Sequence, residues 1–386
     1  MALRVALVCD WFLPRMGGVE LHLRDLALAL RRQGVDACII TTTPGPDVVD
    51  DVPVHRVSVP LLPGAGVSLS PMIVGRIANV LRAEAIDVVH AHASVVSPVA
   101  YAGAIAGARE RLPAVVTFHS MLHHTAMLLG ATDALVAWSR RIVLTAVSSV
   151  VAAQAVRWMS GASVGVLPNA IDVDFWRPDV RPARVGDLRF VSAMRLSRKK
   201  RPLTLVRAFA AATRFVAGAP TMRLTIAGDG PDRDDIVRLA AELGIGDRVV
   251  LAGHLSRSQL RELYATADVF ILPSERESFG IAALEARAAG LPVIAMLAGG
   301  ARDFITPGMN GLLARNTAEL GTFISRLALD PPLRRYMENR NRLAPTEYDW
   351  SAVAAAHLAI YEAAGLTRDA ATAAAQAYPG SASAAK

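Results

Sequence analysis

Short apolar segments of strand length alternate with amphipathic segments of helix length along most of the 386-residue chain. This alternation is typical of parallel βαβ units, in which helices cover both faces of a sheet of nearly continuous apolar strands. In the first half of the chain we predict strands at residues 4–8, 36–41, 86–90, 114–118 and 142–146. A helix is predicted at residues 18–32, and Gly34 ends it. The pattern therefore indicates an α/β fold with a doubly wound parallel sheet.

A second series of apolar segments follows in the other half of the chain. Here we predict strands at residues 188–193, 222–227, 249–251, 269–272 and 292–295. A chain of this length exceeds what one hydrophobic core usually serves, so two domains are expected. The predicted fold is therefore a pair of Rossmann-like doubly wound parallel-sheet domains.

A proline-punctuated stretch with Pro168, Pro178 and Pro182 is suited to a hinge between the two domains. The tail of the chain is rich in alanine, serine and glycine, a composition that is typical of disorder. We therefore predict a first domain, a second domain, a helix that crosses back to the first domain and a disordered tail, at residues 1–175, 176–349, 350–366 and 367–386.

The composition excludes several classes of protein. Apolar residues make up 53% of the chain and charged residues 19%, which is typical of a globular α/β enzyme and not of a disordered chain. The best apolar candidate for a membrane span, at residues 93–108, contains Pro98 and falls short of the roughly 20 residues that a bilayer requires. Residues 1–10 read directly as a strand, without a signal sequence, so we expect a cytoplasmic location.

Charge and cysteine content narrow the choice of partners. The formal net charge of +7 favours anionic ligands or an anionic membrane surface. Nucleic acid is not expected, because the basic residues are not interleaved with the aromatic residues that a stacking platform requires. Cys9 and Cys38 fall on the first two predicted strands, where small buried thiols serve as packing residues, so neither a disulfide nor a metal role is expected.

Glu277 and Glu285 bracket a Ser-Phe-Gly-Ile turn that we predict to open a helix near Ser278. A helix start offers unpaired backbone N–H groups and the positive end of the helix dipole, which can hold a diphosphate. The two carboxylates lie slightly over two helical turns apart, so they share a similar face. One could contact the hydroxyl groups of a sugar and the other the ribose of a nucleotide. The alternative is an ordinary glutamate-rich amphipathic helix.

Five cations follow the strand predicted at residues 188–193, at the end where ligands bind in open parallel sheets. They are Arg195, Arg198, Lys199, Lys200 and Arg201. Such a cluster can neutralise a departing diphosphate, because arginine offers a fork of donors and lysine a point charge. The alternative is a solvated basic loop.

Two glycines, Gly17 and Gly18, follow the first predicted strand and open the first predicted helix. They give the backbone room to approach a diphosphate or a sugar. The full Gly-x-Gly-x-x-Gly dinucleotide fingerprint is absent, so a purely structural role for these glycines is the alternative.

Histidines gather at the carboxyl ends of two neighbouring predicted strands. His119 follows one strand and is a candidate contact of the transferred sugar, while His90 and His92 end the preceding strand. His123 and His124 lie in the next loop. A zinc site is an alternative, but no acidic or thiol ligand lies at a suitable spacing.

Two Asp-x-Asp sequences, one at Asp172 and Asp174 and one at Asp232 and Asp234, match a pattern that binds Mn²⁺ or Mg²⁺ in another class of sugar transferase. The first falls in the predicted hinge, and the second begins a predicted helix, where acidic residues favour the positive end of the dipole. We therefore predict a reaction without a metal, because the arginines and lysines can serve the same electrostatic role.

Taken in order, these motifs resemble the family 4 glycosyltransferases, in which two Rossmann-like domains face each other across a cleft, the GT-B fold. The resemblance rests on Gly17 with Gly18, the segment 167–172, Arg195 with Lys200, the segment 227–231, Glu277 with Glu285, and the segments 299–300 and 310–312. It implies the retaining transfer of a sugar from a nucleotide-diphosphate donor as the two domains close, with no metal or other cofactor strictly required.

The resemblance also implies the roles of individual residues. Arg195 and Lys200 would bind the diphosphate, Glu277 and His119 would contact the donor sugar as further catalytic residues, and Glu285 would bind the ribose. The other donor-binding positions that it implies are Gly17, Gly18, Asn169, Gly228, Leu255, Ser278, Phe279, Gly280 and Ile281.

Two residues depart from the family pattern, because Ala170 and Arg201 stand where the family usually has glycine. Within the family, residues 10–20 and 90–94 are similar to the catalytic subunit that adds N-acetylglucosamine to phosphatidylinositol, and more broadly to bacterial lipid mannosyltransferases. The resemblance therefore implies that a hexose or N-acetylhexosamine is transferred to a hydroxyl acceptor, which we expect to be a membrane lipid or a lipid-linked glycan.

Two loops indicate the nucleotide base of the donor and the cellular location of the reaction. Residues 254–257 offer no carboxylate to the N–H groups of guanine, so UDP is favoured over GDP. The apolar loop at residues 59–73 would let the first domain touch the inner face of an anionic membrane as a peripheral protein. The alternatives are a small soluble acceptor, a non-catalytic partner subunit that binds sugar nucleotides, and an epimerase or phosphorylase of the same architecture.

Overall fold

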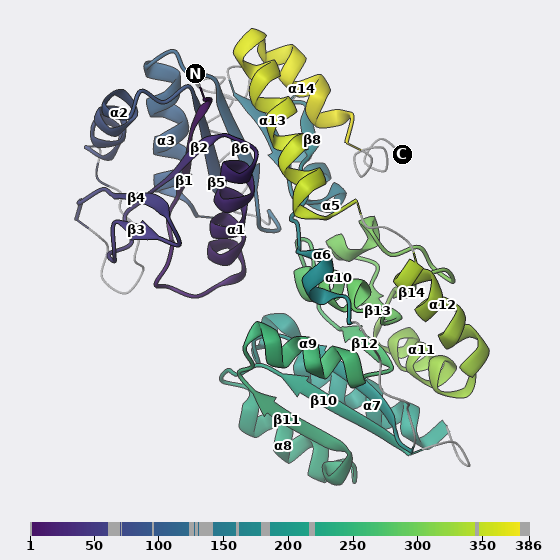
Figure 1. The fold of residues 1–386 in the computed structure, drawn as a ribbon. Helices are drawn as coiled ribbons and strands as arrows, with labels where there is room; N and C mark the ends of the chain where they lie inside the picture. The colour runs from purple at the N-terminus through teal and green to yellow at the C-terminus, as the bar shows by residue number, and fades with distance from the viewer. Residues whose placement is uncertain are drawn as a thin grey trace. The chain divides into compact units, whose positions relative to one another are not determined.

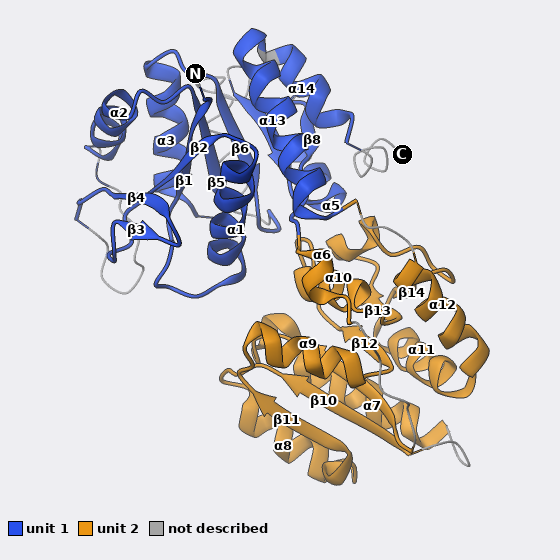
Figure 2. Ribbon diagram, viewed as in Figure 1, with its two compact units in different colours: residues 1–170, 348–386 blue, residues 171–347 orange. Residues whose placement is uncertain are grey.

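The computed structural model describes residues 2–60, 70, 72–94, 96–122, 127, 130, 142–159, 162–178, 186–215, 221–343 and 347–378 (Figure 1). The chain divides into two compact units, each built on its own sheet (Figure 2). Unit 1 comprises Met1–Ala170 and Tyr348–Lys386, and unit 2 comprises Ile171–Glu347. The predicted α/β fold class with two parallel-sheet domains is confirmed.

The sheet of unit 1 has eight strands in the order β3-β4-β2-β1-β5-β6-β7-β8, and every pair is parallel except β3 with β4. The order reverses between β1 and β5, which is where open α/β sheets bind ligands. The strands are β1 Arg4–Cys9, β2 Asp36–Thr41, β3 Val48–Val49, β4 Val52–Arg56, β5 Val88–Ala93, β6 Ala114–Phe118, β7 Val143–Ala146 and β8 Val164–Val166. All five predicted strands of this half are present.

Helices cover both faces of this sheet because successive residues of its strands point to opposite sides. Val5 and Leu7 of β1 join the core that also includes residues of α1, α13 and α14, whereas Ala6 and Val8 join the core with residues of α2 and α3. The helices of unit 1 are α1 Gly18–Arg32, α2 Ile73–Ala83, α3 Pro98–Arg109, α5 Ser149–Trp158, α13 Trp350–Leu366 and α14 Arg368–Gln376.

The last helix of unit 1, α14, corrects the predicted disorder of the tail. Thr367 caps it by accepting a hydrogen bond from the backbone N–H of Ala370 at 3.1 Å. Ala371 and Ala375 are fully buried in the core of unit 1. Alanine is the strongest helix former, and its small side chain conceals the apolar periodicity that would have predicted this helix. Residues 379–386 lie outside the part of the chain that the structure describes.

The sheet of unit 2 has six parallel strands in the order β11-β10-β9-β12-β13-β14. The strands are β9 Leu188–Ala193, β10 Met222–Ala227, β11 Val249–Gly253, β12 Val269–Leu272, β13 Val293–Met296 and β14 Gly311–Ala314. The order reverses between β9 and β12, so a ligand site is expected at the carboxyl ends of these two strands.

The helices of unit 2 precede, connect and follow these strands. They are α6 Val173–Trp176, α7 Pro202–Phe215, α8 Arg233–Glu242, α9 Arg257–Thr266, α10 Ile281–Ala288, α11 Thr317–Leu329 and α12 Pro331–Leu343, with the 3₁₀ helices η2 Arg198–Lys200, η3 Gly246–Arg248 and η4 Gly300–Asp303. Among the described helices of both units, none is both long enough and apolar enough to cross a bilayer.

The division between the units falls after Ala170, five residues before the boundary that prolines suggested. The reason is Trp176, which is fully buried and lies 5.7 Å from the ring of Tyr264 in unit 2, measured between ring centroids. The short helix α6 therefore belongs to unit 2, although its sequence reads as part of a hinge.

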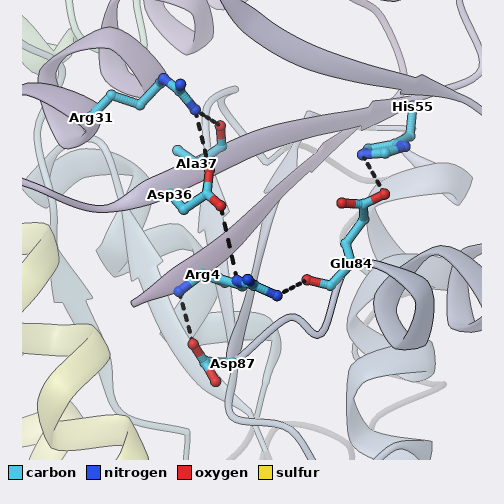
Figure 3. A network of polar contacts seen from close by, with 7 residues as sticks. All are labelled: Arg4, Arg31, Asp36, Ala37, His55, Glu84 and Asp87. Carbon is cyan, nitrogen blue, oxygen red and sulfur yellow. Dashed lines mark hydrogen bonds and ion pairs between the residues drawn. The ribbon is translucent and has the colours of Figure 1, made fainter. Parts of the chain in front are cut away.

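Charged residues tie together the edge of the unit 1 sheet at which the strands begin (Figure 3). The backbone N–H of Arg4 donates to Asp87 at 2.8 Å, and its guanidinium donates to the carbonyl of Glu84 at 3.1 Å. Arg31 pairs with Asp36 at 3.2 Å on the same edge. Exposed ion pairs such as that of Arg31 with Asp36 contribute little to stability, so we assign this network a structural role.

Candidate active site

In unit 2, backbone hydrogen bonds join the segments at the carboxyl ends of β9 and β10. Met194 donates its backbone N–H to Ala227 and Leu196 donates to Asp229, both at 2.9 Å. A β-carbon at Gly228 would lie 1.8 Å from the carbonyl oxygen of Met194, so only glycine fits this predicted donor-binding position. This close approach fixes the loop that carries the basic cluster.

The two predicted catalytic residues Lys200 and Glu277 meet directly, although they lie far apart in the sequence. Lys200 Nζ is 2.6 Å from Glu277 Oε2, which is a charge-assisted hydrogen bond. Glu277 is only 9% exposed, and the backbone N–H of Gly300 holds its carbonyl at 2.8 Å. The structure therefore presents one ammonium and one carboxylate at the end of the sheet.

Arg195, five residues before Lys200 in the sequence, is exposed, and no described residue forms an ion pair or side-chain hydrogen bond with it. Arg201 differs, because it pairs with Glu275 and donates to Thr317 Oγ1 at 3.2 Å. The cluster of five cations is therefore not uniform. One arginine is available for an anionic ligand, and another is used inside the protein.

The helix after Glu277 begins later than predicted, at Ile281 rather than near Ser278. Phe279 buries its side chain against Phe304, and Gly280 takes a left-handed conformation with φ of 97° as the N-cap. Glu277 therefore lies in the loop before α10 and not on its first turn. No side chain caps α10, but Ala283 donates its backbone N–H to the carbonyl of Gly280 at 2.9 Å, which leaves the N–H groups of Ile281 and Ala282 for an anion.

Glu285 and Leu255 are placed by α10 and by the loop before α9. Glu285 is partly buried on α10, and burial together with its charge raises the pKa of the Tyr264 hydroxyl well above the usual range. Leu255 is also partly buried, next to Ser256, which caps α9 in a reciprocal capping box with Gln259. Both predicted donor-binding residues thus lie on elements of unit 2.

In unit 1, the predicted glycine loop is covered by a carboxylate of its own helix. A β-carbon at Gly17 would lie 2.2 Å from Glu20 Oε2, whereas nothing lies within 4 Å of the corresponding position at Gly18. Glu20 is buried, which raises its pKa, and Arg15 lies 3.8 Å from it. Glu20 therefore occupies the start of α1, the place that the sequence assigned to a ligand.

Asn169 and Ala170 end the first segment of unit 1, and both are buried. The side-chain oxygen of Asn169 has no hydrogen-bond partner among the residues that the structure describes. Ala170 lies in the hydrophobic core of unit 1, which accommodates its methyl group where the family usually has glycine.

Five buried histidines form a cluster at the carboxyl ends of β5 and β6. They are His22 of α1, His90 and His92 of β5, His119 after β6 and His357 of α13. The predicted residue His119 is held within it, because its Nε2 lies 2.9 Å from Nδ1 of His92. The sequence could indicate three of the five, but no local signal links His22 and His357 to the strands.

Hydrogen bonds join this cluster to the sheet and to α13. His90 Nδ1 lies 2.7 Å from Tyr361 Oη, and His90 Nε2 lies 2.6 Å from Thr117 Oγ1. By contrast, one buried ring nitrogen in each of His22, His92 and His119 has no hydrogen-bond partner among the described residues. The cluster therefore has unused hydrogen-bonding capacity at the ligand edge of the sheet.

Burial holds the five histidines neutral. It lowers the pKa of His119 to about 3, with a further contribution from the charge of His357, and it lowers the pKa of His357 to about 4. The pKa values of the other three also fall well below the usual range for the same reason. A neutral imidazole can exchange hydrogen bonds with hydroxyl groups, but it cannot neutralise a phosphate.

The two Asp-x-Asp sequences both lie at helix starts. Asp172 caps α6 by accepting from the backbone N–H of Phe175 at 2.9 Å, and Asp234 lies in the first turn of α8. His123 and His124 lie outside the described residues. Among the residues that the structure does describe, no three His, Cys, Asp or Glu side chains group as ligands for a metal ion.

Comparison with known proteins matches each of the two units to a family of glycosyltransferases. Residues 16–175 match the family described as Glycosyltransferase Family 4, and residues 178–344 match the family described as Glycosyl transferases group 1. The chain is 31% identical to a D-inositol 3-phosphate glycosyltransferase of Xylanimonas cellulosilytica, over 92% of this chain and 93% of that protein. It is 33% identical to a GDP-mannose-dependent alpha-mannosyltransferase of Mycolicibacterium smegmatis, over 81% and 84%.

Solved structures agree with the fold. The crystal structure of Anabaena Alr3699/HepE in complex with UDP and glucose superposes with a TM-score of 0.73 at 20% identity, and the match covers 92% of this chain and 98% of that one. Together, the two family matches and the curated relatives confirm the sequence prediction. The chain belongs to the family 4 glycosyltransferases, enzymes of the GT-B fold that take a sugar from a nucleotide-sugar donor.

Proposed function

We propose that this glycosyltransferase moves a hexose or N-acetylhexosamine from a UDP-sugar to a hydroxyl group of a membrane lipid or lipid-linked glycan, with retention of configuration at the anomeric carbon. The observation that carries the proposal is the Lys200–Glu277 pair, with an exposed Arg195 nearby in sequence and the uncapped start of α10 in the same unit. Together, these groups of unit 2 would supply the positive charge and the hydrogen-bond donors that a sugar diphosphate requires.

The proposed reaction breaks the bond between the anomeric carbon and the diphosphate and forms a bond from that carbon to the acceptor oxygen, on the same face. The bonding electrons leave with the diphosphate, so negative charge grows on its oxygen, and this oxygen takes the proton that the acceptor hydroxyl loses. Lys200 and Arg195 stabilise that charge, which lowers the barrier because the interaction is stronger in the transition state than in the bound donor. Glu277 accepts hydrogen bonds from hydroxyl groups of the sugar and keeps the anomeric carbon in position.

The choice of UDP rests on the loop before α9. His254, Leu255 and Arg257 provide no carboxylate, and Ser256 is engaged in capping α9. This loop therefore offers no acceptor suited to the paired N–H groups of guanine. GDP-mannose is the second candidate donor, because one relative is named for its dependence on it.

The acceptor is proposed to use unit 1, whose buried neutral histidines suit hydroxyl groups better than phosphates. A lipid acceptor is supported by the net charge of +7, which favours an anionic membrane surface. The loop at residues 59–73, which would reach the membrane, lies largely outside the described residues. A small phosphorylated cyclitol is the second candidate, because a relative is named for D-inositol 3-phosphate.

A transfer assay tests this proposal. Purified protein is incubated with UDP-glucose, UDP-N-acetylglucosamine or GDP-mannose, together with either liposomes of phosphatidylinositol or inositol 3-phosphate, and with EDTA or Mn²⁺. We expect transfer from a UDP-sugar to lipid, with full activity in EDTA. NMR should show that the anomeric bond of the product has the same axial or equatorial configuration as that of the donor.

The matched variants are Lys200→Met and, as control, Arg238→Gln, which removes an exposed cation of α8 far from the site in sequence. Lys200→Met should lower kcat/KM by about 10² to 10³-fold, the loss typical of removing one group that stabilises charge in a transition state. Undiminished transfer by Lys200→Met, or formation of an isomeric sugar from donor alone, would exclude the proposed reaction.

A further inference from the structure

Arg201 has a backbone conformation that arginine rarely adopts. Its φ of 60° and ψ of 42° are left-handed, and it stands between η2 and the first residue of α7. Glycine accepts this conformation without steric cost, whereas a side chain with a β-carbon does not. A strained residue beside a functional site persists when the surrounding contacts hold it in place, so those contacts need a reason.

The contacts of Arg201 connect three segments of unit 2. Its guanidinium pairs with Glu275 in the loop that leads to α10, and its Nη2 donates to Thr317 Oγ1 at the first residue of α11. Its carbonyl accepts the N–H of Leu205 at 3.1 Å and so begins α7. The side chain is 25% exposed, so these contacts are partly shielded from water.

Two ion pairs therefore lie next to each other between the same two segments, Lys200 with Glu277 and Arg201 with Glu275. Only the first consists of groups that the donor needs. When a diphosphate binds the ammonium of Lys200, it competes with Glu277 for that charge and weakens the first pair. The second pair can persist, because neither of its members has to leave to admit the donor.

We propose that Arg201 is a positioning residue, which acts through Glu275 to keep Lys200 and Glu277 aligned when the donor separates them. The inference rests on the proposed role of Lys200 in binding the donor. It also explains why arginine stands at a left-handed position that glycine would fill without strain: the ion pair with Glu275 and the bond to Thr317 offset that strain.

A double-mutant cycle tests the inference. The variants are Arg201→Gly, Glu275→Gln and the double variant, and the readouts are donor KM, kcat and the melting temperature. Arg201→Gly and Glu275→Gln should each raise donor KM by about threefold to tenfold, and the double variant should raise it no further, because both changes break one contact. The melting temperature of Arg201→Gly should stay near that of the wild type, because relief of the strain offsets the lost ion pair.

Arg238→Gln again serves as the control, because it removes an exposed ion pair with Asp235 within α8 and touches none of the three segments that Arg201 connects. It should leave donor KM unchanged. Conversely, the Arg201→Lys variant keeps the charge and should recover part of the lost affinity.

Three results would overturn the inference. If Arg201→Gly raises KM and Glu275→Gln does not, or if their effects multiply in the double variant, Arg201 contacts the donor directly. If neither variant changes KM, the pair has no positioning role. If the wild type neither binds nor uses any nucleotide sugar, the proposed function itself fails. If the wild type is active, the first two results concern the role of Arg201 alone.

Discussion

The two units have sheets of the same class, but the side chains at the carboxyl ends of their strands differ in charge. In unit 1 these are buried neutral histidines, among them His92 and His119. In unit 2 they are the ions Lys200 and Glu277, with the exposed Arg195. Sheets of one class thus carry two kinds of chemistry, and the charge of the side chains distinguishes a place suited to hydroxyl groups from one suited to a diphosphate.

The difference has a physical origin in burial. The histidines are buried between the sheet and the helices α1 and α13, where a charge would lose its hydration without a counter-ion, so they stay neutral. Lys200 lies in a partly exposed loop opposite a carboxylate, so its charge is compensated and partly hydrated. Perturbing each site in turn should therefore affect different properties of the protein, namely turnover for unit 2 and pH-dependent stability for unit 1.

The largest effect is expected from Glu277→Gln in unit 2. This change keeps the shape of the side chain but removes the charge that holds Lys200, and it weakens the hydrogen bonds offered to the sugar. We expect kcat/KM to fall by about 10²-fold or more while the melting temperature changes little. Steady-state kinetics with circular dichroism as a folding control would measure this, and near-normal turnover would remove Glu277 from the mechanism.

The next effect concerns unit 1 and its response to acid. The pKa of His357 is about 4 in the folded protein and that of His119 about 3, both below the ordinary value of 6.5. Their stabilising contribution is therefore complete above about pH 6.5 and is lost as the pH falls towards 4, because only the unfolded chain binds the protons. Each histidine should reduce the free energy of unfolding by about 2 kcal/mol between pH 7 and pH 5.

Asp10 opposes this trend in the same unit. Burial raises its pKa to about 6, against hydrogen bonds from the backbone of Val99 and Ala100, so the folded state gains stability as Asp10 takes up a proton. The free energy of unfolding should still fall below pH 6, because the histidines outnumber this single aspartate. Denaturant unfolding of the wild type and of His357→Leu at pH 7 and pH 5 measures the balance, and equal pH dependence in both proteins would show that His357 does not contribute to it.

A smaller effect is expected at the exposed cation of unit 2. Arg195→Gln should weaken binding of the donor diphosphate by about tenfold or less at low salt, because an exposed charge acts through screened electrostatics. The difference between wild type and variant should shrink at high ionic strength. Calorimetric titration with UDP at two salt concentrations measures it, and a difference that does not depend on salt would indicate a buried contact instead.

The smallest effect is expected at the other edge of unit 1. Arg31→Gln removes one exposed ion pair with Asp36 from the network of Figure 3 and should change the free energy of unfolding by about 0.5 kcal/mol or less. Turnover should not change. A large loss of activity in this variant would show that the charged edge of unit 1 is not merely structural.

Much of the fold could be predicted from the sequence, because long apolar strands and amphipathic helices leave a periodic pattern. The pattern failed where an element was too short or too uniform. Val48–Val49 and Val164–Val166 are too short to show a period, and α14 is nearly all alanine, threonine and charge. The start of α10 was misplaced because the burial of Phe279 and the conformation of Gly280 depend on the rest of unit 2.

The candidate site was predictable only in part for a similar reason. Lys200 and Glu277 were named from motifs, but their direct contact joins segments that are distant in the sequence. His22 and His357 had no signal at all, because they join the cluster through the packing of α1 and α13. Motifs therefore identified the chemical groups, and only the fold could show which of them meet.

We propose above all that the Lys200–Glu277 site of unit 2 binds a nucleotide-diphosphate sugar. The most direct test is the shift in melting temperature of the wild type and of Lys200→Met with UDP, GDP, ADP and their sugar conjugates, since a ligand that binds only the folded protein raises that temperature. We predict a selective shift with UDP compounds that largely disappears in Lys200→Met. An equal shift in both proteins, or none with any nucleotide, would show that this site does not bind the donor.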